Sequence, residues 1–197
     1  MLSCSKHFDC LYYPNALKYL APVDSPVIAH AKVLKKENPD AKIVFIGPCI
    51  AKKKECRESG LIDNVLTFEE LIELLKENEI DLQEIDAAEE VSWNRERFFP
   101  ISRGIIKSFK ELAEGYEYIA MDGVEKCKEA LQKIDDLENV FLELNSCESA
   151  CINGPCSLNK DNTAIIANAK IRNYVKDNSG TNEKNVMTKL ESVDITC

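Results

Sequence analysis

Histidine, long apolar runs and an excess of positive charge are largely missing from this sequence. Two histidines among 197 residues make a zinc site built on imidazole ligands a poor hypothesis. No apolar run approaches the roughly 18 to 20 residues that cross a bilayer, and residues 1–10 lack the apolar core of a signal peptide, so we expect a cytoplasmic protein with no membrane partner. Acidic residues outnumber basic residues by 34 to 25, without a basic stripe, which argues against a nucleic-acid partner.

Cysteine, in contrast, is more frequent than packing requires. In a reducing compartment, cluster or metal ligation, reactive thiols or small buried hydrophobes explain such residues better than disulfides do. The nine cysteines are Cys4, Cys10, Cys49, Cys56, Cys127, Cys147, Cys151, Cys156 and Cys197. One of them follows an apolar run and three lie together at residues 147–156, and this grouping favours a shared site.

Apolar runs that alternate with amphipathic segments predict an α/β fold with parallel strands flanked by helices. We expect strands at residues 43–46, 64–66, 116–121 and 140–144, with the first buried on both faces of its sheet. We expect helices at residues 12–20, 27–36, 68–77, 105–112 and 124–134. Thr67 and Glu70 form a capping box for the third of these helices.

The chain is long enough for one domain or for two small lobes that share a cleft. We expect the domain at residues 1–168, with a charged surface loop at 78–97. Residues 169–197 are expected to form a polar, loosely ordered C-terminal tail, because they include a segment rich in Gly, Asn and Ser.

Two cysteine sites follow expected strands, and α/β sheets usually bind ligands at the carboxyl ends of their parallel strands. Cys49 lies in the segment FIGPCIAKKKE. In ELNSCESACINGPC, Cys147 and Cys151 are four residues apart, so in a helix their Cβ atoms would lie about 5 to 6 Å apart on one face. The amides at the start of such a helix would stabilise thiolates. A zinc half-site or a redox dithiol is the alternative to a cluster here.

The first segment resembles a motif of the iron-only (FeFe) hydrogenase large subunit, in its C-terminal H-cluster domain. Cys49, Lys52 and Glu55 match the family's MPCxxKxxE, with Gly47 in place of the methionine. The sequence that precedes this motif is also similar, with Ser25 followed by proline at the expected place.

The second segment resembles the family motif ExMACxxGCxxGGGxP. The matching residues are Glu143, Cys147, Cys151 and Gly154. Asn145 replaces the methionine, and Ala150 replaces the glycine before the second cysteine. Together the similarity spans about residues 10–167, and it looks closest to the sensory branch of the family.

The resemblance implies an iron–sulfur cofactor. Cys49 and Cys147 would be ligands of a 4Fe-4S cluster, and Cys151 would bridge this cluster to the two-iron subcluster of the H-cluster. Ligands of one cluster must share one site, so we predict that these three cysteines converge in space.

The resemblance also implies roles for three polar residues. Lys52 occupies the position of a catalytic lysine whose ammonium donates a hydrogen bond to a cyanide on the two-iron subcluster. Glu55 would orient Lys52 or hold the loop in place, and Ser25 would lie near the same subcluster.

The sequence departs from the family at the first cysteine motif, TSCCPxW, which is degenerate here. Cys4 lies two residues from the expected spacing and is the candidate fourth ligand, with Cys156 as the alternative. The family's domain also begins well before the position of Met1, so we expect part of one lobe to be absent. No ferredoxin-like CxxCxxCxxxC run is present, so an electron would come from a ferredoxin-type carrier or from upstream iron–sulfur domains.

Three functional hypotheses follow. The first is a hydrogenase-like domain that nominally catalyses reversible hydrogen oxidation and proton reduction, or senses hydrogen, although this chain alone is expected to be inactive. The second is a non-catalytic domain that binds only a 4Fe-4S cluster. The third is a cluster-free scaffold or interaction domain.

Overall fold

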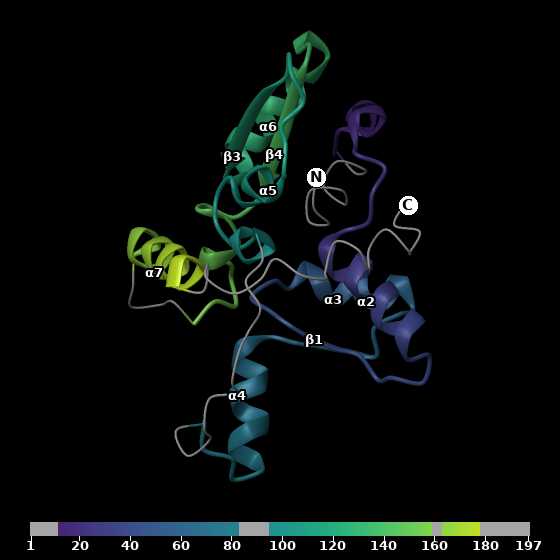
Figure 1. Cartoon of the computed structure of the whole chain (residues 1–197), viewed down its shortest axis with the longest axis vertical. Coiled ribbons are helices and arrows are strands. Elements are labelled where there is room, and N and C mark those ends of the chain that lie inside the picture. Colours follow the sequence, from purple (N-terminus) through teal and green to yellow (C-terminus); the bar gives the residue numbers. More distant parts are fainter. Residues whose placement is uncertain (1–11, 83–94, 159–162, 178–197) are drawn as a thin grey trace.

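The structure is a computed structural model that describes residues 12–82, 95–158 and 163–177 (Figure 1). In chain order, with η marking a 3-10 helix, its elements are η1 (Pro14–Tyr19), α2 (Pro26–Glu37), β1 (Val44–Ile46), α3 (Ala51–Ser59), β2 (Asn64–Leu66), α4 (Phe68–Glu77), η3 (Arg95–Phe98), α5 (Gly104–Ser108), β3 (Glu117–Asp122), α6 (Val124–Gln132), η4 (Ile134–Asp136), β4 (Val140–Asn145), η5 (Ala150–Asn153) and α7 (Ala164–Asp177). Of the expected loop at 78–97, residues 83–94 lie outside the described part of the chain.

The described strands form two separate parallel pairs. β1 pairs with β2, with Val44 opposite Asn64. β3 pairs with β4 over six residues, ending with Asp122 opposite Asn145. Parallel neighbours need a crossover connection, and α3 and α6 provide it. The predicted α/β fold with parallel strands and flanking helices is therefore confirmed, as two βαβ units rather than one sheet.

The first unit has a small core between α2, α3 and its strands. Ile28 and Ala31 of α2 pack there with Ile43, Cys56 and Ile62. Cys56 is completely buried, and this burial raises the pKa of its thiol. Cys56 therefore serves as a small hydrophobic residue in the core.

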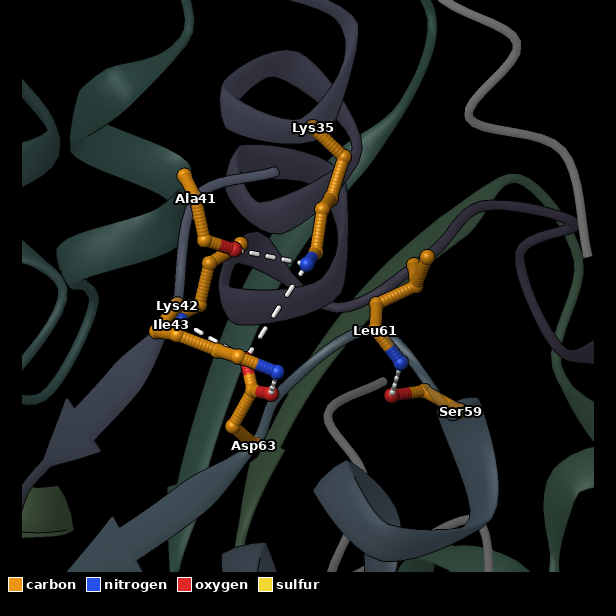
Figure 2. Close-up of polar contacts among 7 residues, drawn as sticks. All are labelled: Lys35, Ala41, Lys42, Ile43, Ser59, Leu61 and Asp63. Carbon is orange, nitrogen blue, oxygen red and sulfur yellow. Dashed lines mark hydrogen bonds and ion pairs between the residues drawn. The ribbon is translucent and has the colours of Figure 1, made fainter. Parts of the chain in front are cut away.

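Asp63 fixes the start of both strands in this unit. Its carboxylate accepts hydrogen bonds from the backbone N–H of Ile43, at 2.8 Å, and from the ammonium of Lys42, at 3.0 Å (Figure 2). Lys35 of α2 lies 4.0 Å from the same carboxylate and donates to the carbonyl of Ala41. One acidic side chain thus joins α2, β1 and β2.

The prediction that β1 is buried on both faces is wrong. Val44 is 49 % exposed and Ile46 is 40 % exposed, whereas Phe45 between them packs against the core. A two-stranded sheet with a core on one side leaves the other face open. The continuous apolar run that suggested full burial cannot reveal this, because it depends on which elements cover the sheet.

Local hydrogen bonds define both ends of helix α4. The predicted capping box is confirmed: the Glu70 N–H donates to Thr67 Oγ1 at 3.2 Å, and the Glu70 carboxylate accepts from the Thr67 N–H at 2.7 Å. At the other end, the Ile80 N–H donates to the carbonyl of Leu75, and Glu79 adopts a left-handed φ of 56°. This is a Schellman ending.

The second unit has a core on one face of its strand pair and an aromatic group on the other. Cys127, Leu131 and Leu144 belong to the core cluster. The ring of Phe109 packs edge-on against those of Tyr118, at 6.3 Å, and Phe141, at 5.2 Å. Helix α5 ends at Ser108, before the predicted end at residue 112, because Phe109 turns into an extended conformation to make these contacts.

Helix α7 extends past residue 168, where we expected the domain to end. Ala167 and Ile171 pack in a third cluster with Ile101 and Ile152, and Val175 is buried. The expectation of a loose tail is thus corrected for residues 169–177, because their apolar residues face the protein. Residues 178–197 lie outside the described part of the chain, and the domain boundary itself stays a prediction.

Replacing Asp63 tests whether this carboxylate holds the first unit together. The Ile43 N–H and then Lys42 hold the pKa of Asp63 below its ordinary value of 3.8. A depressed pKa gives stability that is present above the unfolded-state value and lost as pH falls through the folded-state value. We expect Asp63→Asn to lower the thermal unfolding midpoint at pH 7, with a smaller difference from the parent in strong acid.

The control is Asp40→Asn, which removes an exposed carboxylate from the neighbouring turn. Calorimetry of parent and both variants across the acidic range gives the comparison. Equal midpoints for the two variants at pH 7 would show that Asp63 contributes no specific stability.

Candidate functional site

The turns that follow β1 and β4 meet each other. The chain leaves β1 through Gly47 and Pro48 to reach Cys49, and it leaves β4 through Ser146 to reach Cys147. The carbonyl oxygen of Pro48 accepts a hydrogen bond from the N–H of Cys156, at 3.2 Å. The carboxyl ends of two separate sheets, rather than one sheet edge, therefore form the site.

Gly154 allows these turns to approach so closely. A Cβ atom at this position would lie 2.9 Å from the Pro48 carbonyl oxygen and 3.1 Å from the Cys151 carbonyl oxygen. Both neighbours are backbone atoms, which cannot move aside as a side chain could. The glycine at this position is required by space, since its φ of −63° suits any residue.

Three thiols share the site. Burial, followed by the charge of Cys49, raises the pKa of Cys147. Burial raises the pKa of Cys151 to about 11, with further contributions from Cys49 and Cys147. Cys147 interacts electrostatically with Cys49, and Cys151 with both, so the three thiols lie in one region of the molecule. Their convergence on a single cluster stays a prediction.

Two further cysteines, Cys4 and Cys156, are the candidates for a fourth cluster ligand. Cys4 lies outside the described residues. Cys156 is partly buried, and its backbone is tied to the Pro48 turn. In the described part of the chain, no group of three or more His, Cys, Asp or Glu side chains could hold a single metal ion. A 4Fe-4S cluster takes one thiolate at each iron, so its ligands need no such arrangement.

Lys52 is the cation of the site. It is the second residue of α3 and forms an ion pair with Glu55, with both side chains less than one-fifth exposed. Its charge lowers the pKa of Cys151 and so opposes the effect of burial. The next two lysines face elsewhere, because Lys53 pairs with Glu70 and Lys54 with a glutamate of its own helix. Glu55 thus holds Lys52, as predicted.

Ser25 precedes α2 and carries an unsatisfied hydroxyl. Its Oγ is buried and has no hydrogen-bond partner among the described residues. The neighbouring Asp24 forms an ion pair with Lys32 at 2.6 Å. A buried hydroxyl without a partner is unfavourable and is free to bind a ligand atom.

Cys147 does not begin a helix, so the helical spacing considered for Cys147 and Cys151 does not apply. Cys147 lies in a turn in which both Ser149 and Ala150 have a φ of 63°, and Cys151 lies in the short helix η5. Two successive left-handed residues are incompatible with a helix. Ala150 stands where the family motif has glycine, and its left-handed φ explains why glycine suits that position.

Sequence reasoning missed a buried polar network at the ends of β3 and β4. The side-chain amide of Asn145 donates to Asp122, at 2.9 Å, and to Glu143, at 3.4 Å. Glu143 also accepts from the backbone N–H of Ile106, at 3.0 Å. Asp122 contributes to the raised pKa of Cys151. Two polar residues spaced by two on an otherwise apolar strand were the signal for this network.

The fold and the two cysteine segments agree with the comparison to known proteins. A model of the family described as "Iron only hydrogenase large subunit, C-terminal domain" matches residues 6–155. The chain belongs to this family. No helix among the described residues of this hydrogenase-family chain has the length and apolarity to cross a membrane.

Solved [FeFe]-hydrogenase structures share the fold of this family member. The HydA(deltaEFG) structure, reported on stepwise H-cluster assembly, matches with a TM-score of 0.64 and 14% identity, over 93% of this chain and 65% of that chain. A variant of HydA1 from Chlamydomonas reinhardtii gives 0.65 and 14% identity, over 92% and 67%. Apo HydA1 of the same organism, in another variant, gives 0.63 and 14%, over 92% and 66%. The chain thus spans about two thirds of these relatives.

Thiol cross-linking tests the convergence directly. We expect a short bifunctional thiol reagent to join Cys49 to Cys147 or Cys151 in the full chain, as mapped by digestion and mass spectrometry. Gly154→Ala should lower the yield of this cross-link severalfold, because its Cβ pushes the two turns apart.

Gly60→Ala is the matched control, since a Cβ there meets no atom within 4 Å and its cost is backbone strain alone. That strain is worth about 1 kcal/mol and lies at the far end of α3. An equal loss of cross-link in both glycine variants would mean that the contact at Gly154 does not set the site.

Proposed function

We propose that this chain is an iron-only hydrogenase-like domain that binds a 4Fe-4S cluster through Cys49, Cys147 and Cys151. The observation that carries the proposal is the backbone contact between the turn that holds Cys49 and the segment that holds Cys147 and Cys151, through the hydrogen bond from Cys156 to Pro48 and the close approach at Gly154. The electrostatic effect of Lys52 on Cys151 supports it. Iron binding requires thiolates, and the neighbouring cation favours them.

The donor set also suits a two-iron subcluster. Such a group, with cyanide ligands, would supply the reversible chemistry of protons and hydrogen when bound. Lys52 would donate a charge-assisted hydrogen bond to it, Glu55 would hold the ammonium in place, and the Ser25 hydroxyl would offer a further donor. We propose Cys4 as the fourth cluster ligand, with Cys156 as the alternative.

The physiological role follows from these groups. We propose reversible hydrogen oxidation and proton reduction, or hydrogen sensing, in the cytoplasm, with electrons exchanged with a ferredoxin-type carrier or with other iron–sulfur domains. We expect this chain by itself to be inactive, because the first family motif is degenerate and its second cysteine is missing.

A non-catalytic 4Fe-4S domain is the second candidate, and one observation favours it. Asn145 stands where the family motif has methionine, and its amide joins two carboxylates instead of presenting an apolar surface to the site. A polar network of this kind alters the surroundings of a two-iron group more than those of a cluster held by thiolates. A cluster-free scaffold is the third candidate.

Anaerobic reconstitution with iron and sulfide separates cluster binding from a cluster-free scaffold. We expect the parent to acquire about four irons and four sulfides per chain with the absorbance of a 4Fe-4S cluster. Cys49→Ser and Cys147→Ser should each lose most of it. Cys127→Ser should retain it, because that thiol lies in the core and contacts the carbonyl of Asn145.

Cys4→Ser and Cys156→Ser, made side by side, identify the fourth ligand. A parent that takes up no more iron and sulfide than the Cys49→Ser variant would leave the scaffold as the remaining function.

Lys52 distinguishes a two-iron site from a cluster site. After loading with a synthetic two-iron complex, we expect Lys52→Ala to lose about tenfold or more of the cyanide and carbon monoxide infrared signal, since a charge-assisted hydrogen bond is worth about 1.5–3 kcal/mol. Its 4Fe-4S absorbance should persist. Lys53→Ala is the control, because that lysine pairs with Glu70 on α4.

Equal infrared signals from Lys52→Ala and Lys53→Ala would remove Lys52 from the site. Parent protein that loads no two-iron group at all would support the non-catalytic candidate.

A further inference from the structure

Helix α4 carries an apolar stripe that is partly exposed and lies outside the hydrophobic clusters of the described residues. Phe68, Leu71, Ile72 and Leu75 recur at intervals of three and four residues and so share one face. None of the ten residues of α4 is buried, and none belongs to the hydrophobic clusters of the described residues. Figure 1 shows this helix standing away from the other labelled helices. A helix this short usually gains its stability from packing, so the stripe suits a docking partner.

The edge of the stripe is acidic and selects the kind of partner. Glu69, Glu73 and Glu77 follow one another at four-residue intervals, and all three are exposed. Lys76 is the one cation between residues 68 and 82. This edge repels the anionic surface of a membrane and also the same helix of another copy. It fits an apolar surface that is edged with Lys or Arg.

Helix α7 presents a surface of that chemistry. Its inner side packs through Ala167 and Ile171. On its outer side Ile165 is 80 % exposed and Ile166 is 46 % exposed. Lys170 and Arg172, one to two turns further along, are exposed.

The surroundings of α7 add to its positive charge. Four of the five arginines of the chain lie in η3, beside α5 and in α7: they are Arg95, Arg97, Arg103 and Arg172. Helix α7 packs against η3, and the ring of Tyr174 on α7 lies under the guanidinium of Arg97. Burial, followed by Arg172 and Arg103, lowers the pKa of Lys107. In a chain of net charge −9, this is a distinct basic surface.

We propose that two copies of this chain form a symmetric dimer in which α4 of each copy docks against the outer side of α7 of the other. Figure 1 shows α4 and α7 apart within one chain, so the contact joins different copies. Because each copy carries both surfaces, a two-fold axis makes the contact twice. The apolar residues are buried between the helices, and the opposite charges select the pairing.

Charge reversal tests this pairing. The α4-reversed variant is Glu73→Lys with Glu77→Lys, and the α7-reversed variant is Lys170→Glu with Arg172→Glu. In sedimentation velocity at concentrations up to on the order of 100 µM, we expect the parent to dimerise and each variant to need at least about tenfold more protein to do so. Glu73→Gln with Glu77→Gln should give an intermediate shift. It also covers the case in which a reversed variant does not fold.

Mixing the two reversed variants is the decisive step. In the mixture, each basic α4 faces an acidic α7 and each acidic α4 faces a basic α7, so both contacts are complementary again. We expect a one-to-one complex with about the parent's affinity. Glu111→Lys with Glu114→Lys, which reverses two exposed charges outside the described helices and strands, is the control and should dimerise like the parent.

Several results would overturn the proposal: a parent that stays monomeric throughout, reversed variants that dimerise like the parent, or a mixture that does not associate. Dimerisation lost in the Glu111 and Glu114 control would do the same, because net charge would then explain the effect. A concentration-independent drop in the melting temperature of Leu71→Gln with Leu75→Gln would show that the chain itself covers the stripe, and would also refute a dimer contact there.

Discussion

The close approach of two backbone turns is the constraint on which the site depends. The two strand pairs of the described chain are not hydrogen-bonded to each other, so nothing in either sheet brings Cys49 near Cys147. The hydrogen bond from Cys156 to the Pro48 carbonyl, together with the space left by Gly154, joins the units at this point. Backbone groups thereby set a separation that side chains could adjust only at a cost in packing.

Burial raises the pKa of Cys147 and of Cys151 and so favours the neutral form of these two thiols. Burial is the largest cause of the raised pKa of Cys151, and the single cation that opposes it is held in place by Glu55. If the site binds iron as proposed, binding would release protons from these thiols. Charge and geometry act on the same three residues.

The departures from the family motif lie in the structure at positions with a physical meaning. Asn145 uses its amide to bridge Asp122 and Glu143, so it links β3 and β4 two residues before Cys147. Ala150 keeps the left-handed backbone that a glycine would adopt without strain. The backbone at Ala150 thus has a conformation that suits glycine, and the strand before it carries a polar network.

The sequence by itself determined the local features: the capping box at Thr67, the strand at Asn64–Leu66, the pairing of Lys52 with Glu55, and the cysteines that share a site. These depend on near neighbours or on a family motif. Tertiary structure decided the exposure of Val44, the turn at Cys147, the extent of α7 and the network around Asn145. Each of these depends on which distant segment covers or contacts the residue, and no local pattern encodes that.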